Sequence, residues 1–176
     1  ASCLVGSEMC IRDRSFTENI IKLAYLYRER LISLVTNWMR VGYCQGNFNS
    51  DNCAAGGFTL DYGPFGFCEL FDPRFQPWTG GGDHFSFFNQ PFAAEINFKM
   101  FCASLRPLLL ENKEDIEKLE QIKNDFSKSM EKEMQLMWAK KIGLEKYEEA
   151  LINDLFNLMV ISKTDFTIFF RKLSYI

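Results

Sequence analysis

The sequence predicts one mainly α-helical domain whose glycine-rich loop region carries a short β-hairpin. Apolar residues recur at three- and four-residue steps over most of the chain, which is the period of a helix. Six of the eleven glycines lie between Gly42 and Gly66, and such a density indicates tight turns. With 176 residues, 47% of them hydrophobic, the chain can bury one sizeable core.

Residues 1–14 have no hydrophobic period and do not lead into the helix that follows. They contain too few apolar residues for a signal peptide and resemble a read-through leader, so we expect a non-native leader or a disordered arm. An irregular native arm is the alternative. If the segment is a leader, Cys3 and Cys10 carry no information about function.

The first helix is predicted to begin at Ser15. Ser15 and Glu18 form an S-x-x-E capping box, and apolar residues then repeat at helical steps as far as Trp38. This indicates a helix of about six turns that stops at Gly42. The loop 42–67 follows, with short strands expected at Phe58-Thr59-Leu60 and, directly afterwards, at Phe65-Gly66-Phe67.

The segment 72–89 is rich in proline, glycine and aromatic residues, which predicts an ordered excursion without regular structure. Asn89 is then expected to cap a helix over 91–106, in which Pro91 suits the first turn. Pro107 ends this helix.

The helical remainder, 89–176, continues with a longer helix that opens at Asn112 and ends at Gly143. Its inward positions are Ile116, Leu119, Ile122, Phe126, Met130 and Met137. Two more helices are predicted over 145–160 and 164–173, the second with Thr164 as its cap.

Charge and composition argue against several classes of partner. The net charge of −3 and the absence of clustered Lys and Arg disfavour nucleic acid and anionic membranes. No apolar run approaches the roughly 20 residues that span a bilayer. We therefore expect a soluble monomer. The six cysteines are scattered, which favours reduced thiols, and Cys44, Cys53 and Cys68 lack the CxxC spacing of a zinc site.

The loop 42–67 contains the residues that chemistry on a magnesium-bound nucleotide requires. Kinases hold Mg²⁺ with an Asn of the catalytic loop and the Asp of an Asp-Phe-Gly turn, while a second Asp accepts the proton of the attacking hydroxyl. This sequence offers Asp51-Asn52 and then Asp61-Tyr62-Gly63. Ordinary protein kinases place the catalytic Asp five residues before the Asn, so the adjacent pair disfavours an ordinary kinase. Solvated turn residues are the other interpretation.

Longer strings carry a resemblance to a known family. Residues 45–52 read Gln-Gly-Asn-Phe-Asn-Ser-Asp-Asn, 57–67 read Gly-Phe-Thr-Leu-Asp-Tyr-Gly-Pro-Phe-Gly-Phe, and 89–91 read Asn-Gln-Pro. Together with Asp-Phe-Thr-Ile-Phe-Phe-Arg at 165–171, these strings closely resemble the selenoprotein O family. The resemblance covers nearly everything after Arg14.

Members of that family have a protein-kinase-like fold and act as protein adenylyltransferases. The resemblance implies that 15–176 is part of the large (C-terminal) lobe, with the small lobe missing. It also implies ATP as substrate, Mg²⁺ or Mn²⁺ as cofactor, and transfer of AMP to Ser, Thr or Tyr hydroxyls of proteins. Asn52 and Asp61 would hold the metal and nucleotide, Asp51 would be the base, and Gln45, Gly46 and Gly63 would structure the loop. The expected compartment is mitochondrial for a eukaryotic source and cytoplasmic for a bacterial one.

Two positions depart from the family pattern. Gln45 stands where His is usual, and His84 stands where Arg is usual. Gln cannot titrate, so we expect a structural role at position 45, and we expect His84 to be a packing or surface residue. No small-lobe lysine, partner Glu or glycine-rich lid can be placed, so the chain should be inactive alone. A phosphoryl-transferring enzyme and a catalytically dead scaffold remain the alternatives.

Overall fold

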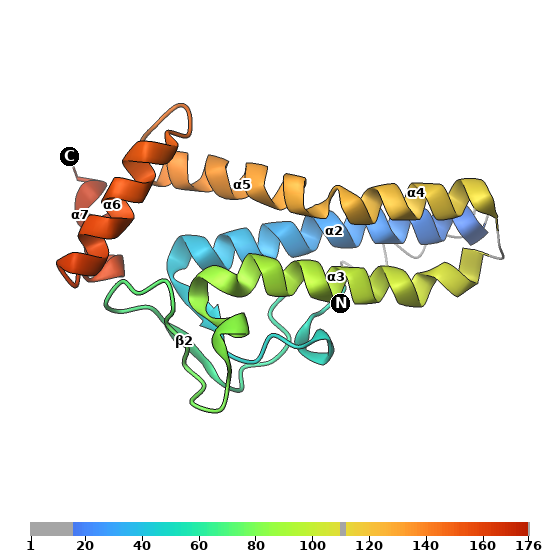
Figure 1. Cartoon of the computed structure of the whole chain (residues 1–176), viewed down its shortest axis with the longest axis horizontal. Helices are drawn as coiled ribbons and strands as arrows, with labels where there is room; N and C mark the ends of the chain where they lie inside the picture. The colour runs from blue at the N-terminus through green and yellow to red at the C-terminus, as the bar shows by residue number, and fades with distance from the viewer. Residues whose placement is uncertain (1–15, 110–111, 176) are drawn as a thin grey trace.

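The computed structural model describes residues 16–109 and 112–175. Helices α2 (Phe16–Val41) and α3 (Gln90–Leu105) lie alongside α4 (Lys113–Asn124) and α5 (Phe126–Lys141), which follow one another end to end (Figure 1). Two further helices, α6 (Glu149–Ile161) and α7 (Phe166–Leu173), gather at one end of this bundle, and the loops lie along one side. The mainly helical class is confirmed, whereas assignment to a kinase-like lobe remains a prediction.

Helix α2 is the centre of the bundle and contacts α3, α4 and α5. Its buried positions include six that follow the helical period predicted from the sequence, namely Ile20, Ala24, Tyr27, Leu31, Val35 and Trp38. The predicted end is also confirmed, because Gly42 has a φ of +78°, which favours glycine. The Ser15 half of the predicted capping box lies outside the described residues.

The sheet consists of two short antiparallel strands, β1 (Tyr43–Gln45) and β2 (Phe65–Phe67), with Tyr43 opposite Phe67. The prediction of a strand at β2 is therefore confirmed. The predicted strand over 58–60 is wrong, since this segment forms only an isolated bridge from Thr59 to Cys53. The physical reason is that Thr59 is held against α2, where the Trp38 indole donates to its hydroxyl at 3.0 Å.

The excursion before α3 is not wholly irregular, since it contains two 3₁₀ turns, Asp83–Phe85 and Phe87–Asn89. Asn89 is not a side-chain cap, which corrects the prediction. Its backbone is already helical, and its amide instead donates to the Asp83 carbonyl at 2.7 Å. Pro91 does lie in the first turn of α3, and the helix gives way to a 3₁₀ turn, Arg106–Leu109, that contains Pro107.

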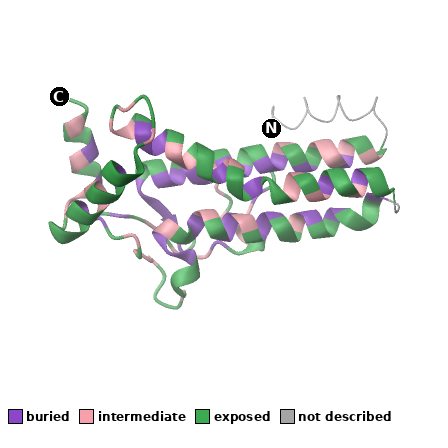
Figure 2. Cartoon of the chain, turned by 45° about the horizontal axis from the view of Figure 1, so that its top comes forward, coloured by how far each residue is buried: buried purple, intermediate pink, exposed green. Residues whose placement is uncertain are grey.

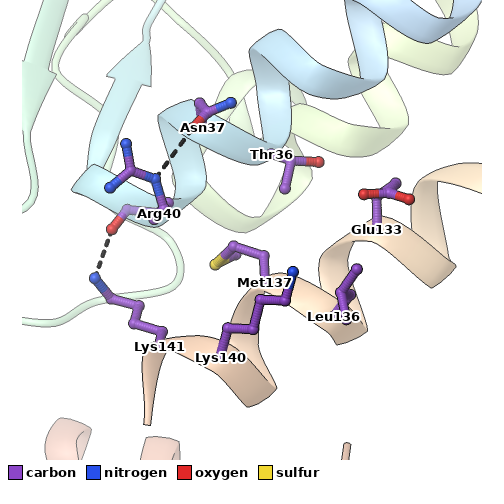
Figure 3. A pocket seen from close by; sticks show the side chains of 8 residues that line it. All are labelled: Thr36, Asn37, Arg40, Glu133, Leu136, Met137, Lys140 and Lys141. Atoms are coloured by element: carbon purple, nitrogen blue, oxygen red, sulfur yellow. Dashed lines mark hydrogen bonds between the residues drawn. The ribbon is translucent and has the colours of Figure 1, made fainter. Parts of the chain in front are cut away.

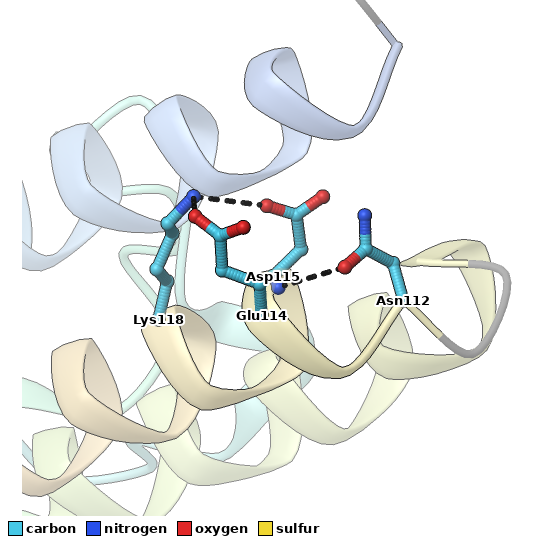
Figure 4. Close-up of polar contacts among 4 residues, drawn as sticks. All are labelled: Asn112, Glu114, Asp115 and Lys118. Carbon is cyan, nitrogen blue, oxygen red and sulfur yellow. Dashed lines mark hydrogen bonds and ion pairs between the residues drawn. The ribbon is translucent and has the colours of Figure 1, made fainter.

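The single long helix predicted over 112–143 is two helices, separated at Asp125. Asn124 and Asp125 are both weak helix formers, because their side chains compete for the backbone. The predicted start is confirmed, since the Asn112 side chain accepts the Asp115 N–H at 3.4 Å (Figure 4). Beside this cap, Lys118 pairs with Glu114 and Asp115 at 2.8 and 3.3 Å.

The last two helices begin later than the sequence predicts. Helix α6 begins at Glu149, because residues 144–148 form an irregular link after Gly143, whose φ is +79°. Helix α7 is capped by Asp165, whose carboxylate accepts the Ile168 N–H at 2.8 Å, and not by Thr164. The Thr164 hydroxyl is instead paired with Ser162.

This correction gives a testable prediction. We expect Asp165→Ala to lower the free energy of unfolding by about 1 kcal/mol, because the first turn of α7 loses its cap. Thr164→Ala should cost less than half as much. Urea unfolding of the two variants and the parent chain measures both values, and equal losses would show that Asp165 is not the functional cap.

Helix α7 reaches the loop that follows β2. The Phe166 N–H donates to the Glu69 carbonyl, and the Phe71 N–H donates to the Thr164 carbonyl, both at 2.8 Å. Beneath them is an aromatic cluster of Phe71, Phe88, Trp138, Phe156 and Phe166. Figure 2 shows how buried residues, in purple, alternate with exposed ones, in green, along the helices. No helix in the described ranges is both long enough and apolar enough to cross a membrane.

Candidate active site

Asp51 and Asn52 lie together in a 3₁₀ turn, Ser50–Asn52, which we call the catalytic turn. The Asn52 side-chain NH₂ donates to the Asn47 carbonyl at 2.9 Å, which fixes the orientation of the amide. The Asn52 amide oxygen has no hydrogen bond within the described part of the chain. Asp51 is exposed, so its carboxylate is accessible to a substrate hydroxyl.

Asp61 folds its carboxylate back over the Asp-Tyr-Gly turn. One carboxylate oxygen accepts the Gly63 N–H at 3.0 Å. A Cβ atom on Gly63 would lie 2.9 Å from the other carboxylate oxygen, so a side chain here would displace the carboxylate from this position. Gly63 therefore shapes the turn, and one Asp61 oxygen remains available as a ligand.

The backbone brings these two segments next to one another. Cys53 follows Asn52 directly, Thr59 lies two residues before Asp61, and Cys53 and Thr59 form an antiparallel bridge. Residues opposite each other in such a bridge have Cα atoms about 5 Å apart. The structure therefore places Asn52 and Asp61 on neighbouring backbone segments, although no hydrogen bond joins them among the described residues.

Helix α2 anchors the loop that carries this bridge. The Tyr27 hydroxyl and the Cys53 thiol lie 3.0 Å apart, and Gly57, with a φ of +72°, packs against Arg30. A Cβ atom on Gly57 would lie 2.5 Å from the Arg30 Cβ. Burial raises the pKa of Tyr27 and of Cys53, so both groups stay neutral at pH 7. The contact is thus a neutral structural one.

Gln90 is a site residue that the sequence did not single out as functional. Its side chain is fully buried, and its carbonyl oxygen accepts the Gln45 N–H at 2.9 Å. Its NH₂ group donates to the Tyr43 carbonyl at 2.9 Å and to the Phe87 carbonyl at 3.2 Å. Gln90 therefore clamps β1, which leads into the catalytic turn. The Asn-Gln-Pro string was the available signal.

Asn97 has a similar role about two turns further along the same face of α3. It is 5% exposed, and its amide donates to the Phe48 carbonyl at 2.9 Å. Phe48 lies two residues before the first residue of the catalytic turn and is itself fully buried. The spacing of seven residues from Gln90, which puts both amides on one face of the helix, was the signal that could have indicated this contact.

Gln45 lies inside the fold and does not reach solvent. It is 1% exposed, and its side-chain oxygen accepts a hydrogen bond from the Tyr43 hydroxyl. Burial, followed by the nearby Tyr62 and Asp61, raises the pKa of Tyr43, which keeps the hydroxyl protonated and able to donate. These contacts agree with a structural role for Gln45.

Gly46 is required by close backbone packing. Its N–H donates to the Pro64 carbonyl at 2.7 Å, and a Cβ atom would lie 2.5 Å from that same carbonyl oxygen. Any side chain here would push the β1 end away from the segment between Asp61 and β2. His84, in contrast, is exposed, with its ring 4.2 Å from the ring of Phe85.

A groove of about 370 Å³ lies between α2 and α5, away from these residues (Figure 3). Its walls include Arg40, Lys140 and Lys141, and none of the predicted site residues. The Lys141 ammonium donates to the Arg40 carbonyl at 2.6 Å. Burial and the nearby Arg40 lower the pKa of Lys141 to about 8. We interpret this contact as a brace between the ends of the two helices.

The donor set at the catalytic turn suits a hard cation. Mg²⁺ prefers oxygen ligands and usually takes only one or two from a protein. Asp61 supplies a carboxylate oxygen, and Asn52 an amide oxygen that is already oriented. The described residues contain no cluster of three or more His, Cys, Asp or Glu side chains that would form a metal cage. The four described cysteines are free thiols.

The sequence is similar to characterised protein families. The family model described as "Protein adenylyltransferase SelO" matches residues 15–176. "Protein nucleotidyltransferase YdiU" of Rhodopirellula baltica is 36% identical over 147 residues, which are 80% of this chain and 26% of that protein. The protein of the same name from Variovorax paradoxus is 37% identical over 152 residues, 83% of this chain and 30% of the relative.

The protein of the same name from Brevibacillus brevis is 36% identical over 152 residues, and the match covers 83% of this chain and 31% of the relative. This chain thus spans between a quarter and a third of the length of these relatives. The family model covers the catalytic turn, the Asp-Tyr-Gly turn and all the described helices. The chain belongs to the SelO family of nucleotidyltransferases.

Proposed function

We propose that this chain is part of a protein adenylyltransferase that transfers AMP from ATP to Ser, Thr or Tyr hydroxyls of other proteins. The observation that carries the proposal is the catalytic turn beside the Asp61 turn, with the Asn52 amide fixed by the Asn47 carbonyl. The family name and the names of the relatives support nucleotidyl transfer.

Each residue has a defined task in this proposal. Asn52 and Asp61 would hold a Mg²⁺ ion, which would neutralise negative charge on the phosphates of ATP. Asp51 accepts the proton of the substrate hydroxyl. The hydroxyl oxygen then bonds to the α-phosphorus, the bond from that phosphorus to the bridging oxygen breaks, and pyrophosphate leaves. Gln90 and Asn97 keep the catalytic turn in place from α3.

The 176 residues are expected to need the rest of the protein for activity. Phosphoryl and nucleotidyl transfer depend on cationic side chains that hold the phosphates. Among residues 16–109 and 112–175, no Lys or Arg side chain is hydrogen-bonded or ion-paired to Asp51, Asn52 or Asp61. The phosphate-binding groups would therefore come from elsewhere in a full-length protein.

Labelled ATP tests the type of transfer. The protein to use is a chimera in which residues 15–176 replace the matching segment of the Variovorax paradoxus relative, which itself serves as the positive control. We expect label from the α-phosphate to remain on protein, and label from the γ-phosphate to leave with pyrophosphate. Transfer of the γ label alone would establish phosphoryl transfer, and transfer of neither label would favour the scaffold interpretation.

A further inference from the structure

Helix α3 carries apolar residues on both its inward and its outward side, and the outward side also carries the Glu95–Lys99 ion pair at 2.6 Å. The inner face contains Ala94, Phe98 and Cys102, which are at most 2% exposed. The opposite face contains Phe92, Ile96 and Met100, which are 58%, 42% and 55% exposed; we call these three residues the outer stripe. A contiguous row of exposed apolar side chains is a candidate contact surface. The described residues leave all three side chains of the outer stripe partly exposed.

The outer stripe has the geometry of a helix-packing ridge. Its residues are spaced four apart, so they form one row about 12 Å long. Beside this row is a hollow of about 270 Å³ whose other wall includes Asn49, Ser50 and His84. A helix laid along the row would therefore contact the residues that lead into Asp51.

The size of the outer stripe argues against a second copy of this chain as its partner. Three partly exposed side chains offer on the order of 300 Å² of apolar surface, whereas a stable protein–protein interface buries roughly 1,200–2,000 Å² in total. A contact of this size is ordinary inside a folded chain, where no association entropy is lost.

The length of the relatives indicates what covers the outer stripe. The match extends over 26% of the Rhodopirellula protein and 31% of the Brevibacillus protein, so most of a full-length SelO polypeptide lies outside the residues described here. We infer that the outer stripe is the docking face for an apolar helix from that remaining part of the full-length protein. The docked helix closes the hollow and holds Asn49 and Ser50.

The docking of the helix rests on packing alone, so it does not depend on the proposed function. Its effect on catalysis does rest on the proposed function, because the docked helix would hold Ser50 and so steady the turn that carries Asp51. Loss of docking therefore lowers thermal stability in a full-length protein whether or not the reaction is AMP transfer. The two proposals can fail separately.

The double substitution Ile96→Ser/Met100→Ser tests the inference in two backgrounds. In the 176-residue chain, where both side chains are exposed, we expect Tm to change by less than about 2 °C. In the chimera, where the docked helix would bury both, we expect Tm to fall by about 5 °C or more. Phe98→Ala, on the buried face of α3, is the matched control and should lower Tm in both proteins.

Each of the following results would contradict the inference. Small Tm changes in both backgrounds would show that the outer stripe is exposed in the full-length protein. Unchanged Tm with a raised KM for the protein substrate would assign the face to substrate binding. A dimer of the 176-residue chain in analytical ultracentrifugation that the substitutions dissociate, without an effect on the chimera, would assign it to self-association. If the chimera does not fold, the same substitutions at the aligned positions of the Variovorax relative give the same readout.

Discussion

Asp61→Asn in the chimera should reduce the rate of AMP transfer by about a hundredfold or more. Asn keeps the size of the side chain and an oxygen that can accept the Gly63 N–H, so the turn should persist. What is lost is the negative charge that would hold Mg²⁺ against the phosphates, an effect of several kcal/mol, and each 1.36 kcal/mol is about tenfold in rate. The measurement is the initial rate with α-labelled ATP over a range of Mg²⁺ concentrations.

Asp83→Asn is the matched control for this experiment. Asp83 is exposed in the segment 72–89, outside the loop that carries Asp61, and its side chain makes no hydrogen bond among the described residues. Removal of its charge should leave the rate within about twofold. Unfolding of Asp61→Asn should occur at the same temperature as that of the parent. A rate above a tenth of the parent value at saturating Mg²⁺ would remove Asp61 from the set of proposed metal ligands.

The helical part of the fold could be predicted from sequence because helical periodicity is a local property. The end of α2 at Gly42 and the start of α4 at Asn112 both follow from nearest neighbours in the chain. The errors arose where two weak local signals competed. Thr164 and Asp165 are both acceptable caps, and only the packing of Phe166 against the loop after β2 decides which one begins α7.

The strand pairing could not be predicted for a different reason. The sequence indicates that 65–67 can form a strand, but not that its partner is 43–45 on the far side of a long loop. That choice depends on contacts distant in sequence, such as the Gly46 N–H to the Pro64 carbonyl. A strand at 58–60 would have been nearer, but Thr59 is bound to Trp38 on α2.

The sequence predicted which residues form the candidate site, but it did not predict how they are arranged in space. Asp51, Asn52 and Asp61 are visible in the sequence because their types suit Mg²⁺ chemistry. The features that the structure adds are the orientation of the Asn52 amide and the two α3 side chains that position the loop, Gln90 and Asn97. Buried polar contacts of this kind join segments more than 40 residues apart, so no local pattern contains them.

Gln90→Leu should lower the free energy of unfolding of the 176-residue chain by about 3 kcal/mol or more. Leu has a similar volume, so the change leaves little cavity while it removes the hydrogen bonds of Gln90 to Gln45, Tyr43 and Phe87 and the weaker one to the Met39 sulfur. The Gln45 N–H and the Tyr43 carbonyl would remain buried without these partners, at about 1–3 kcal/mol for each unsatisfied group. Urea unfolding with an unchanged m-value measures the loss.

Asn89→Ala is the neighbouring control, because it removes one hydrogen bond at an exposed position and should cost less than about 1 kcal/mol.

The difference between the two losses tests whether the Gln90 side chain holds the two-stranded sheet in place. Strands of three residues, such as β1 and β2, are too short to be stable by their own pairing. The hydrogen bonds that Gln90 makes from α3 therefore supply stability that the backbone pairing of these short strands lacks. A loss below about 1 kcal/mol for Gln90→Leu would mean that the Tyr43 and Phe65 packing alone fixes the entry to the catalytic turn.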